Sequence, residues 1–233
     1  MTTALDHLVI AAHTLAQGAA WCQATLGVVP GPGGRHAFMG THNRLLRIDS
    51  AGFAQAYLEI IAIDPEAPPP GRPRWFGLDE PALQARLRQA PRLLHAVLRT
   101  PNIEMLRWGL VNVGVQPGEP MAAERNTPAG LLHWRILLRN DGAIALDGAL
   151  PTLIEWGAVH PTANMPASPL ALRSATVAGL PERVRQVLRP RGWTVAEAGP
   201  ALQVVLDTPL GPVTLCTDGP TPLTDTADAH DHG

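Results

Sequence analysis

An internal repeat is the feature that most constrains the fold of this chain. The segment Leu93 to Met105, LLHAVLRTPNIEM, repeats the opening segment Leu5 to Leu15, LDHLVIAAHTL, with His95 and His7 at the same place in the two copies. In each copy a short apolar strand runs into a polar turn, which a helical pattern follows. A repeat of this kind means that one supersecondary unit occurs more than once, so it fixes the architecture before any single element is assigned.

Both copies have the pattern of a βαβββ unit. In the first, Thr14 suits a helix N-cap and Gly27 a C-cap, with apolar residues at helical spacing between them. In the second, the helical pattern starts at Ile103 and closes at Gly114. Each copy ends in an apolar strand that carries one glutamate, Glu59 or Glu155.

A third and weaker copy follows from Leu172 to Thr217, with Ser174 where the other copies have histidine and no glutamate in its last strand. We therefore expect an α+β fold, in which paired βαβββ modules form a cupped mixed sheet and a third, degenerate module is appended. The predicted organisation is a first module at 1–63, a linker at 64–92, a second module at 93–160, the third module at 170–217 and a disordered tail at 218–233.

The composition restricts the classes of partner. A net charge of -2 and a pI near 6.5 give no basic surface for nucleic acid, and no apolar run approaches the length of a membrane span. All 18 basic residues are arginines, which excludes lysine chemistry such as a Schiff base. Two cysteines that are far apart in the sequence suit a reducing compartment. We expect a cytoplasmic protein with a small-molecule substrate, and the sequence leaves room for a homodimer.

The repeated histidines and glutamates predict a site. A charged glutamate on so apolar a strand costs several kcal/mol to bury without a partner. A closed sheet could bring together two imidazoles and two carboxylates, those of His7, His95, Glu59 and Glu155. Such a mixed set suits a divalent metal ion, Zn, Ni, Mn, Co or Fe(II), with open positions for water or substrate.

Ion pairs are the alternative explanation for the two glutamates. Glu59 could pair with Arg47 or Arg99, and Glu155 with Arg135, as charged groups that line a cavity. Both interpretations remain open on the sequence alone.

Further polar residues are candidates for substrate binding and proton transfer. A dense polar cluster follows the glycine-rich turn PGPGG and is interpreted either as substrate-orienting or as a hydrogen-bonded turn. Its members are His36, Thr41, His42, Asn43 and Arg44. His133 lies on an alternating strand and is a candidate proton carrier, or a plain wall residue.

These motifs resemble the vicinal-oxygen-chelate superfamily. The stretch LLHAVLRTPNIEML is similar to the opening strand of bacterial glyoxalase I, and GGRHAFMGTHNRLLRID followed by YLEIIAID is similar to the glyoxalase-like domain branch. The match covers Leu5 to His160, and Leu172 to Thr217 more weakly. In glyoxalase I and the similar methylmalonyl-CoA epimerases, the metal ligands come from the first and last strands of each module. The resemblance therefore implies the ligands His7, Glu59, His95 and Glu155.

The function that this resemblance implies is a metal-dependent lyase or isomerase of glyoxalase type. The metal would polarise a carbonyl or enediolate oxygen pair, while a carboxylate, Glu155 first and Glu59 second, moves a proton. One alternative is a metal-dependent dioxygenase, which usually needs two histidines and one carboxylate. Another is a non-enzymatic small-molecule binder of the drug-sequestering kind.

Overall fold

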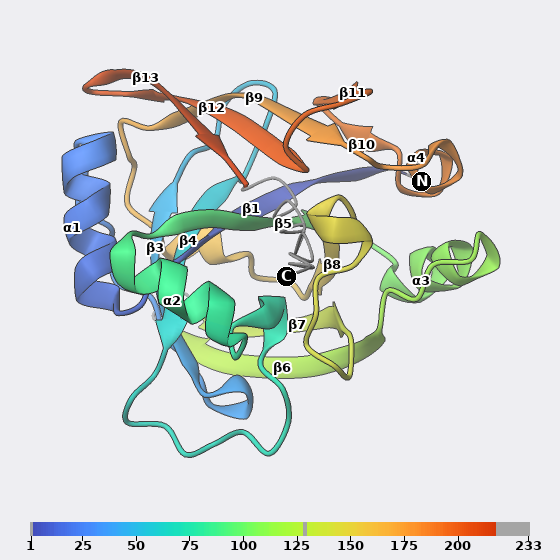
Figure 1. The fold of residues 1–233 in the computed structure, drawn as a ribbon, viewed down its shortest axis with the longest axis horizontal. Helices are drawn as coiled ribbons and strands as arrows, with labels where there is room; N and C mark the ends of the chain where they lie inside the picture. The colour runs from blue at the N-terminus through green and yellow to red at the C-terminus, as the bar shows by residue number, and fades with distance from the viewer. Residues whose placement is uncertain (1, 128–129, 218–233) are drawn as a thin grey trace, which may run out of the picture.

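The computed structural model describes residues 2–127 and 130–217, and within them the chain forms successive β-α-β units around two sheets (Figure 1). The first module comprises β1 (Thr3–Ala11), α1 (Leu15–Leu26), β2 (Arg35–His36), β3 (Thr41–Arg47) and β4 (Tyr57–Ile63), with the 3-10 helix η1 (Ala37–Met39) before β3. The connector contains η2 (Trp75–Gly77) and α2 (Pro81–Gln89). The predicted tail at 218–233 lies outside the described residues.

The second module repeats this order. It comprises β5 (Arg92–Arg99), α3 (Ile103–Asn112), β6 (Glu119–Thr127), β7 (Gly130–Leu138), η3 (Leu146–Gly148) and β8 (Thr152–Trp156). After η4 (Pro161–Asn164), the third module comprises β9 (Ala171–Ala178), α4 (Glu182–Leu188), β10 (Pro190–Arg191), β11 (Trp193–Ala196), β12 (Leu202–Thr208) and β13 (Gly211–Cys216). The α+β prediction with paired βαβββ modules and a third, degenerate one is confirmed.

The helix ends follow from their capping residues. The Thr14 hydroxyl accepts a hydrogen bond from the backbone N–H of Gln17 at 3.1 Å, and Gly27 ends α1 with a φ of 71°. A left-handed residue at this place favours glycine, so the predicted start and end of α1 are both confirmed. Asn102 caps α3 in the same way, accepting from the N–H of Met105 at 3.0 Å.

The two modules share one sheet, in the order β2-β3-β4-β1-β5-β8-β7-β6. Its centre is the antiparallel pair of β1 and β5, the first strands of the two modules. On its outer side each first strand pairs in parallel with the last strand of its own module, β1 with β4 and β5 with β8. The two halves of the sheet are therefore arranged alike about the β1–β5 pair (Figure 1).

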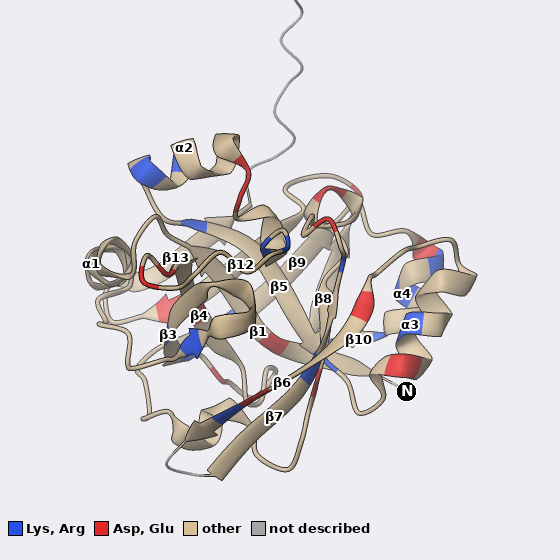
Figure 2. Cartoon of the chain, turned by 90° about the horizontal axis from the view of Figure 1, so that it is seen from below, with Lys and Arg blue, Asp and Glu red and all other residues tan. Residues whose placement is uncertain are grey.

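The third module covers one face of this sheet. Four of its five strands form a second sheet, β11-β9-β12-β13, which lies over β1 and β5 in Figure 1. Apolar side chains of both sheets form one core between them together with side chains of α1, α3 and α4. The short strand β10 leaves this module to pair with the start of β1, and α4 lies beside α3 (Figure 2). Figure 2 also shows arginines and acidic residues spread over elements all round the chain.

The opposite, inner face of the main sheet carries a second apolar core. Val9, Val97 and Ile154 pack there against Trp75 and Phe76 of the connector. Alternation along the strands separates the two cores, because the neighbours of these residues point to the other face. Within the described residues, no helix has the length and apolar character needed to cross a membrane.

The contact between α1 and β4 predicts a sensitive position. A Cβ added at Gly18 would lie 2.4 Å from Cγ2 of Ile60, so the helix could not keep its place against the sheet. Overpacking costs about 1–3 kcal/mol, while alanine returns up to about 1 kcal/mol of helix propensity. We expect Gly18→Ala to lower the free energy of unfolding by roughly 1–2 kcal/mol. Urea unfolding measures it, with Gly52→Ala as the control because nothing lies near that Cβ. An unchanged or higher midpoint for Gly18→Ala would contradict the packing described.

Candidate functional site

A small pocket lies on the inner face of the sheet, and we call it the inner pocket. Several polar side chains line it. Its volume is about 40 Å³ and its walls are largely apolar, with aromatic side chains from the connector and from β7 and β8. Its polar lining residues are His7, His36, Asn43, Tyr57, Glu59 and Arg125. A few polar groups in an apolar pocket are typical of a small-molecule site.

Glu59 is the centre of the inner pocket. The parallel register of β1 and β4 pairs Val9 with Glu59, so the carboxylate lies on the same face as the side chain of His7. One carboxylate oxygen accepts a hydrogen bond from the Asn43 amide at 2.6 Å and lies 3.9 Å from Nε2 of His36. The other lies 3.6 Å from Nε2 of His7. With only 6% of its surface exposed, Glu59 is a buried carboxylate stabilised by polar neighbours instead of by an arginine.

Asp6 orients His7. The β1–β5 pairing shifts register between Leu5 and His7, a β-bulge that lets the adjacent residues Asp6 and His7 contact each other. An Asp6 carboxylate oxygen accepts from Nδ1 of His7 at 2.7 Å, so Nδ1 carries a proton and Nε2 faces Glu59.

Asp6 is fully buried and is shared by several donors. Its second oxygen accepts from Nε1 of Trp156 at 2.9 Å and lies 3.0 Å from Nε2 of His160. Burial alone would raise the pKa of Asp6, but the hydrogen bonds from His160 and His7 hold it well below its usual range. Asp6 therefore remains ionised and fixes the imidazole of His7.

Burial also shapes the other aromatic and imidazole groups of the inner pocket. It lowers the pKa of His36 to about 4, and the nearby Arg125 contributes in the same direction. The ring of Tyr57 stacks on that of His7 with centroids 4.7 Å apart, and burial raises the Tyr57 pKa well above its usual value. His36 and Tyr57 are therefore neutral polar groups at ordinary pH.

Arg125 stands where the inner pocket opens. It also lines an adjoining cavity of about 540 Å³, which shares Leu45, Leu132 and Pro161 with the inner pocket. Its Nη1 is buried and has no hydrogen-bond partner among the described residues. This nitrogen packs against Gly34, where an added Cβ would lie 1.7 Å from it, and Arg125 is a positively charged residue in the wall of both cavities.

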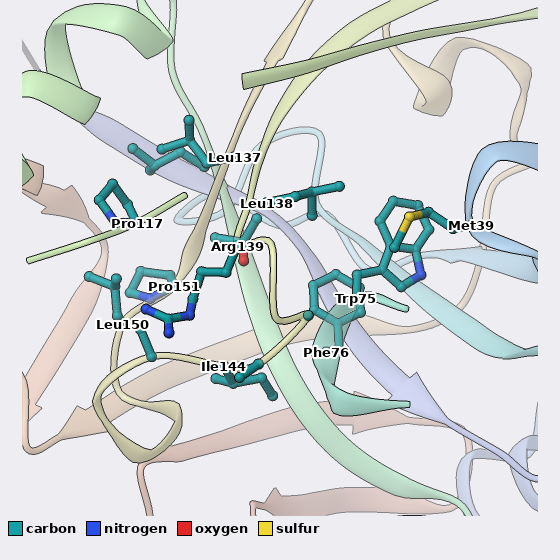
Figure 3. Close-up of a pocket in the computed structure, with 15 residues that line it drawn as sticks. Met39, Trp75, Phe76, Pro117, Leu137, Leu138, Arg139, Ile144, Leu150 and Pro151 are labelled. Carbon is teal, nitrogen blue, oxygen red and sulfur yellow. The ribbon is translucent and has the colours of Figure 1, made fainter. Parts of the chain in front are cut away.

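The connector divides the inner face. Trp75 and Phe76 stack with ring centroids 5.5 Å apart and lie beside Met39 (Figure 3). They line both the inner pocket and a second cavity of about 30 Å³ on their far side, which Figure 3 shows. Phe76 has a φ of 58°, a left-handed conformation that is strained for a bulky residue, and the next residue, Gly77, is held by a hydrogen bond to Gly142 O.

His95 contacts this connector and lines neither of the two cavities. Its ring is 5.4 Å from that of Phe76, and its Nε2 accepts a hydrogen bond from the N–H of Thr152 at 3.1 Å. Burial lowers the pKa of His95 to about 3, with His7 contributing in the same direction. Because the lone pair of Nε2 is used by the backbone of β8, it is not available to a metal ion.

Glu155 does not join the other predicted ligands. The register pairs Val97 with Thr152 as it pairs Val9 with Glu59, so Thr152 occupies the place of the glutamate in the second module. Glu155 comes three residues later and points to the opposite face. There it accepts from Arg135 Nη2 and from the N–H of Ile103, both at 2.7 Å. The ion-pair explanation therefore holds for Glu155.

The structure does not assemble the predicted set of four metal ligands. His7 and Glu59 face each other, whereas Nε2 of His95 is bonded to Thr152 and Glu155 lies on the other face. In the described part of the chain, no group of three or more His, Cys, Asp and Glu side chains is placed to hold a metal ion. The donors present do not fit a four-ligand centre.

The polar cluster after the glycine-rich turn divides between two faces, because Thr41 begins strand β3. Asn43 lines the inner pocket, as does His36, whose Nδ1 lies 3.1 Å from the Thr41 hydroxyl. His42 and Arg44 alternate with them and point away, His42 toward Asp64 at 3.8 Å.

His133 is exposed on β7, where Leu132 and Trp134 supply the pocket wall, so its predicted role in proton transfer has no geometric support. Three features of the site were not predicted from the sequence: Asp6, Arg125 and the connector aromatics Trp75 and Phe76. Only Asp6 had a signal, as a charged residue within an apolar strand.

The buried histidines predict a dependence of stability on pH. In the unfolded chain histidine takes up a proton near pH 6.5, whereas His36 and His95 stay neutral in the folded protein down to about 4 and 3. The unfolded state therefore binds more protons over this window, and stability falls as the pH falls through it.

We expect His95→Gln to make this fall shallower in urea unfolding between about pH 7 and pH 4. His13→Asn is the control, because His13 is exposed and should leave the slope unchanged. Equal slopes for His95→Gln and the unmodified protein would contradict the burial of a neutral His95.

The comparisons with known proteins agree with this architecture. Residues 5–191 match the family model described as a glyoxalase-like domain. No curated protein matched the sequence. A hypothetical protein from Staphylococcus aureus has a similar structure at 17% identity and a TM-score of 0.54, over 77% of this chain and 70% of that one.

Two epimerase structures are more distant. A single-residue variant of methylmalonyl-CoA epimerase from Streptomyces coelicolor, in complex with 2-nitronate-propionyl-CoA, is 19% identical over 69% of this chain and 99% of that one, with a TM-score of 0.42. The Mycobacterium tuberculosis epimerase is 15% identical over 68% and 90%, with a TM-score of 0.37. The match of the family model over most of the chain shows the relationship: the chain belongs to the glyoxalase-like domain family of the vicinal-oxygen-chelate superfamily.

Proposed function

We propose that this protein is a lyase or isomerase that moves a proton on a small, enolisable carbonyl compound in the inner pocket. The observation that carries the proposal is the buried Glu59 carboxylate, which faces Nε2 of His7 in an otherwise largely apolar pocket. A carboxylate held in place next to a small-molecule pocket is a common general base, because it can reach the proton that it removes.

Four polar residues of the inner pocket have a role in this proposal. Glu59 removes the proton next to the substrate carbonyl, and the Asn43 amide, bonded to it at 2.6 Å, holds the carboxylate in place. His7 is oriented by Asp6 and supplies the second proton-carrying group. Arg125, in the wall of both cavities, stabilises the negative charge that develops on the substrate oxygen.

The shape of the site limits what part of a substrate reaches Glu59. The inner pocket, about 40 Å³, accepts only a small reactive group, whereas the adjoining cavity of about 540 Å³ can hold a larger remainder. Arg125 lies at the junction of the two. A substrate with its carbonyl group at this junction and its remainder outside satisfies both volumes.

A conservative pair of substitutions tests the role of Glu59. Glu59→Gln keeps the shape of the side chain and removes the base, so turnover should fall roughly 100-fold or more. Glu155→Gln makes the same chemical change on the opposite face of the sheet and should leave turnover within a few-fold. The measurement is turnover of a panel of 2-oxoaldehydes and acyl thioesters, with calorimetric binding of every hit.

The panel also separates the enzyme from the alternative of a sequestering protein. Equal loss of turnover in both variants would contradict the assignment of Glu59. Tight binding of a hit without conversion by any of the three proteins would favour the non-enzymatic binder.

Metal removal is a separate test. Because the described residues provide no group of three ligands, we expect protein purified without chelator to contain well under one equivalent of Zn, Ni, Mn, Co or Fe. Turnover should survive dialysis against EDTA. One firmly bound equivalent, with turnover lost on its removal and restored on its return, would instead support the metal-dependent lyase, isomerase or dioxygenase.

A further inference from the structure

A separate cavity of about 400 Å³ lies at the start of β1, and we call it the basic cavity. Two arginines, Arg99 and Arg191, line it together with His160, Gln55 and threonines, and no Asp or Glu is among its lining residues. It is roughly ten times as large as the inner pocket, from which Trp156 separates it as a wall common to both.

The strand register places the two arginines on either side of one small residue. Ala4 of β1 pairs with Arg99 of β5 on one side and with Arg191 of β10 on the other. Residues paired across neighbouring strands project to the same face, and adjacent strands lie about 4.8 Å apart. The guanidinium groups therefore rise from backbones roughly 10 Å apart, with only a methyl group between them.

Arg99 is held in position before any ligand binds. Its Nη1 donates to Leu5 O at 2.5 Å and its Nη2 to Ala54 O at 2.7 Å. A guanidinium has five N–H donors in a fixed fork, so these two bonds leave others for a ligand. Both acceptors are neutral backbone carbonyls, so these hydrogen bonds do not cancel the positive charge of Arg99.

The carboxylate of Asp6 acts electrostatically on Arg99. Its oxygens already accept hydrogen bonds from His7 and Trp156, with His160 at 3.0 Å. One carboxylate against two guanidinium groups leaves the region positive. Such a cavity favours a ligand of negative charge.

The third module completes the basic cavity. It supplies Arg191 through β10, the strand that leaves its own sheet to pair with β1. The first two modules alone would provide only Arg99. The third module, which lacks the histidine and the glutamate of the other two, therefore contributes to ligand binding through Arg191.

We propose that the basic cavity binds a small oxyanion, a phosphate or carboxylate group, between Arg99 and Arg191. Charge-assisted hydrogen bonds from two guanidinium forks match the planar or tetrahedral oxygens of either group. The site is distinct from the inner pocket, and its occupation does not depend on the proposed proton transfer.

Calorimetric titration of the full chain with inorganic phosphate and, separately, with malonate at constant ionic strength tests the proposal and distinguishes the two sources of oxyanion. We expect saturable binding of one equivalent of at least one of them. Arg191→Gln should weaken it about tenfold or more, because each charge-assisted hydrogen bond contributes strongly. Arg183→Gln is the matched control, since Arg183 is an exposed arginine of α4 outside the cavity lining.

Two further variants make the outcome decisive. Arg99→Gln should also weaken binding, and thermal unfolding of each variant checks that it is folded. Glu59→Gln should bind as the unmodified protein does, which separates this site from the proposed catalytic one. Absence of saturable binding for both anions, or equal weakening by Arg191→Gln and Arg183→Gln, would overturn the proposal.

Discussion

The antiparallel pairing of β1 with β5 is the contact on which the rest of the structure depends. β1 and β5 are the first strands of their modules, and they pair with each other along one edge. The other edge of β1 pairs with β4, and the other edge of β5 pairs with β8. The side chains of His7 and His95 consequently lie on the same, inner face. The bulge in this pair also allows Asp6 to contact His7, so the joint between the modules sets the chemistry of the inner pocket.

Two buried carboxylates, Asp6 and Glu59, lie beside this strand pair, and burying them costs free energy. Removing a carboxylate from water costs several kcal/mol unless hydrogen bonds replace its hydration. Asp6 has donors from β1, β8 and the segment before η4, and it therefore ties the two modules together. Glu59 has fewer donors, the Asn43 amide and two imidazoles at longer distances. The better-satisfied carboxylate suits a structural and orienting role, and the less satisfied one suits reaction.

The sequence predicts the modules well because repetition, capping residues and strand alternation are local signals, as at Thr14 and Gly27. It predicts the first half of the site for the same reason, since His7 and Glu59 lie on strands that pair directly. Glu155 was placed wrongly because counting along a strand does not fix its register, and a shift by an odd number reverses the face. His133 was ambiguous, since both faces of its strand are partly apolar. No local sequence pattern predicts that Arg125 lines the pocket, because tertiary packing alone brings β6 next to the strands that carry His7 and Glu59.

The connector between the modules has a consequence for how such a chain can diversify. Two copies of one module provide two equivalent concave faces. The segment that joins the copies occurs only once, so the repeat does not constrain its sequence. Here that segment places Trp75 and Phe76 between the inner pocket, which contains Glu59, and the second cavity, which Thr152 lines. Changes in a tether of this kind can give two relatives different substrates while every repeated strand stays the same.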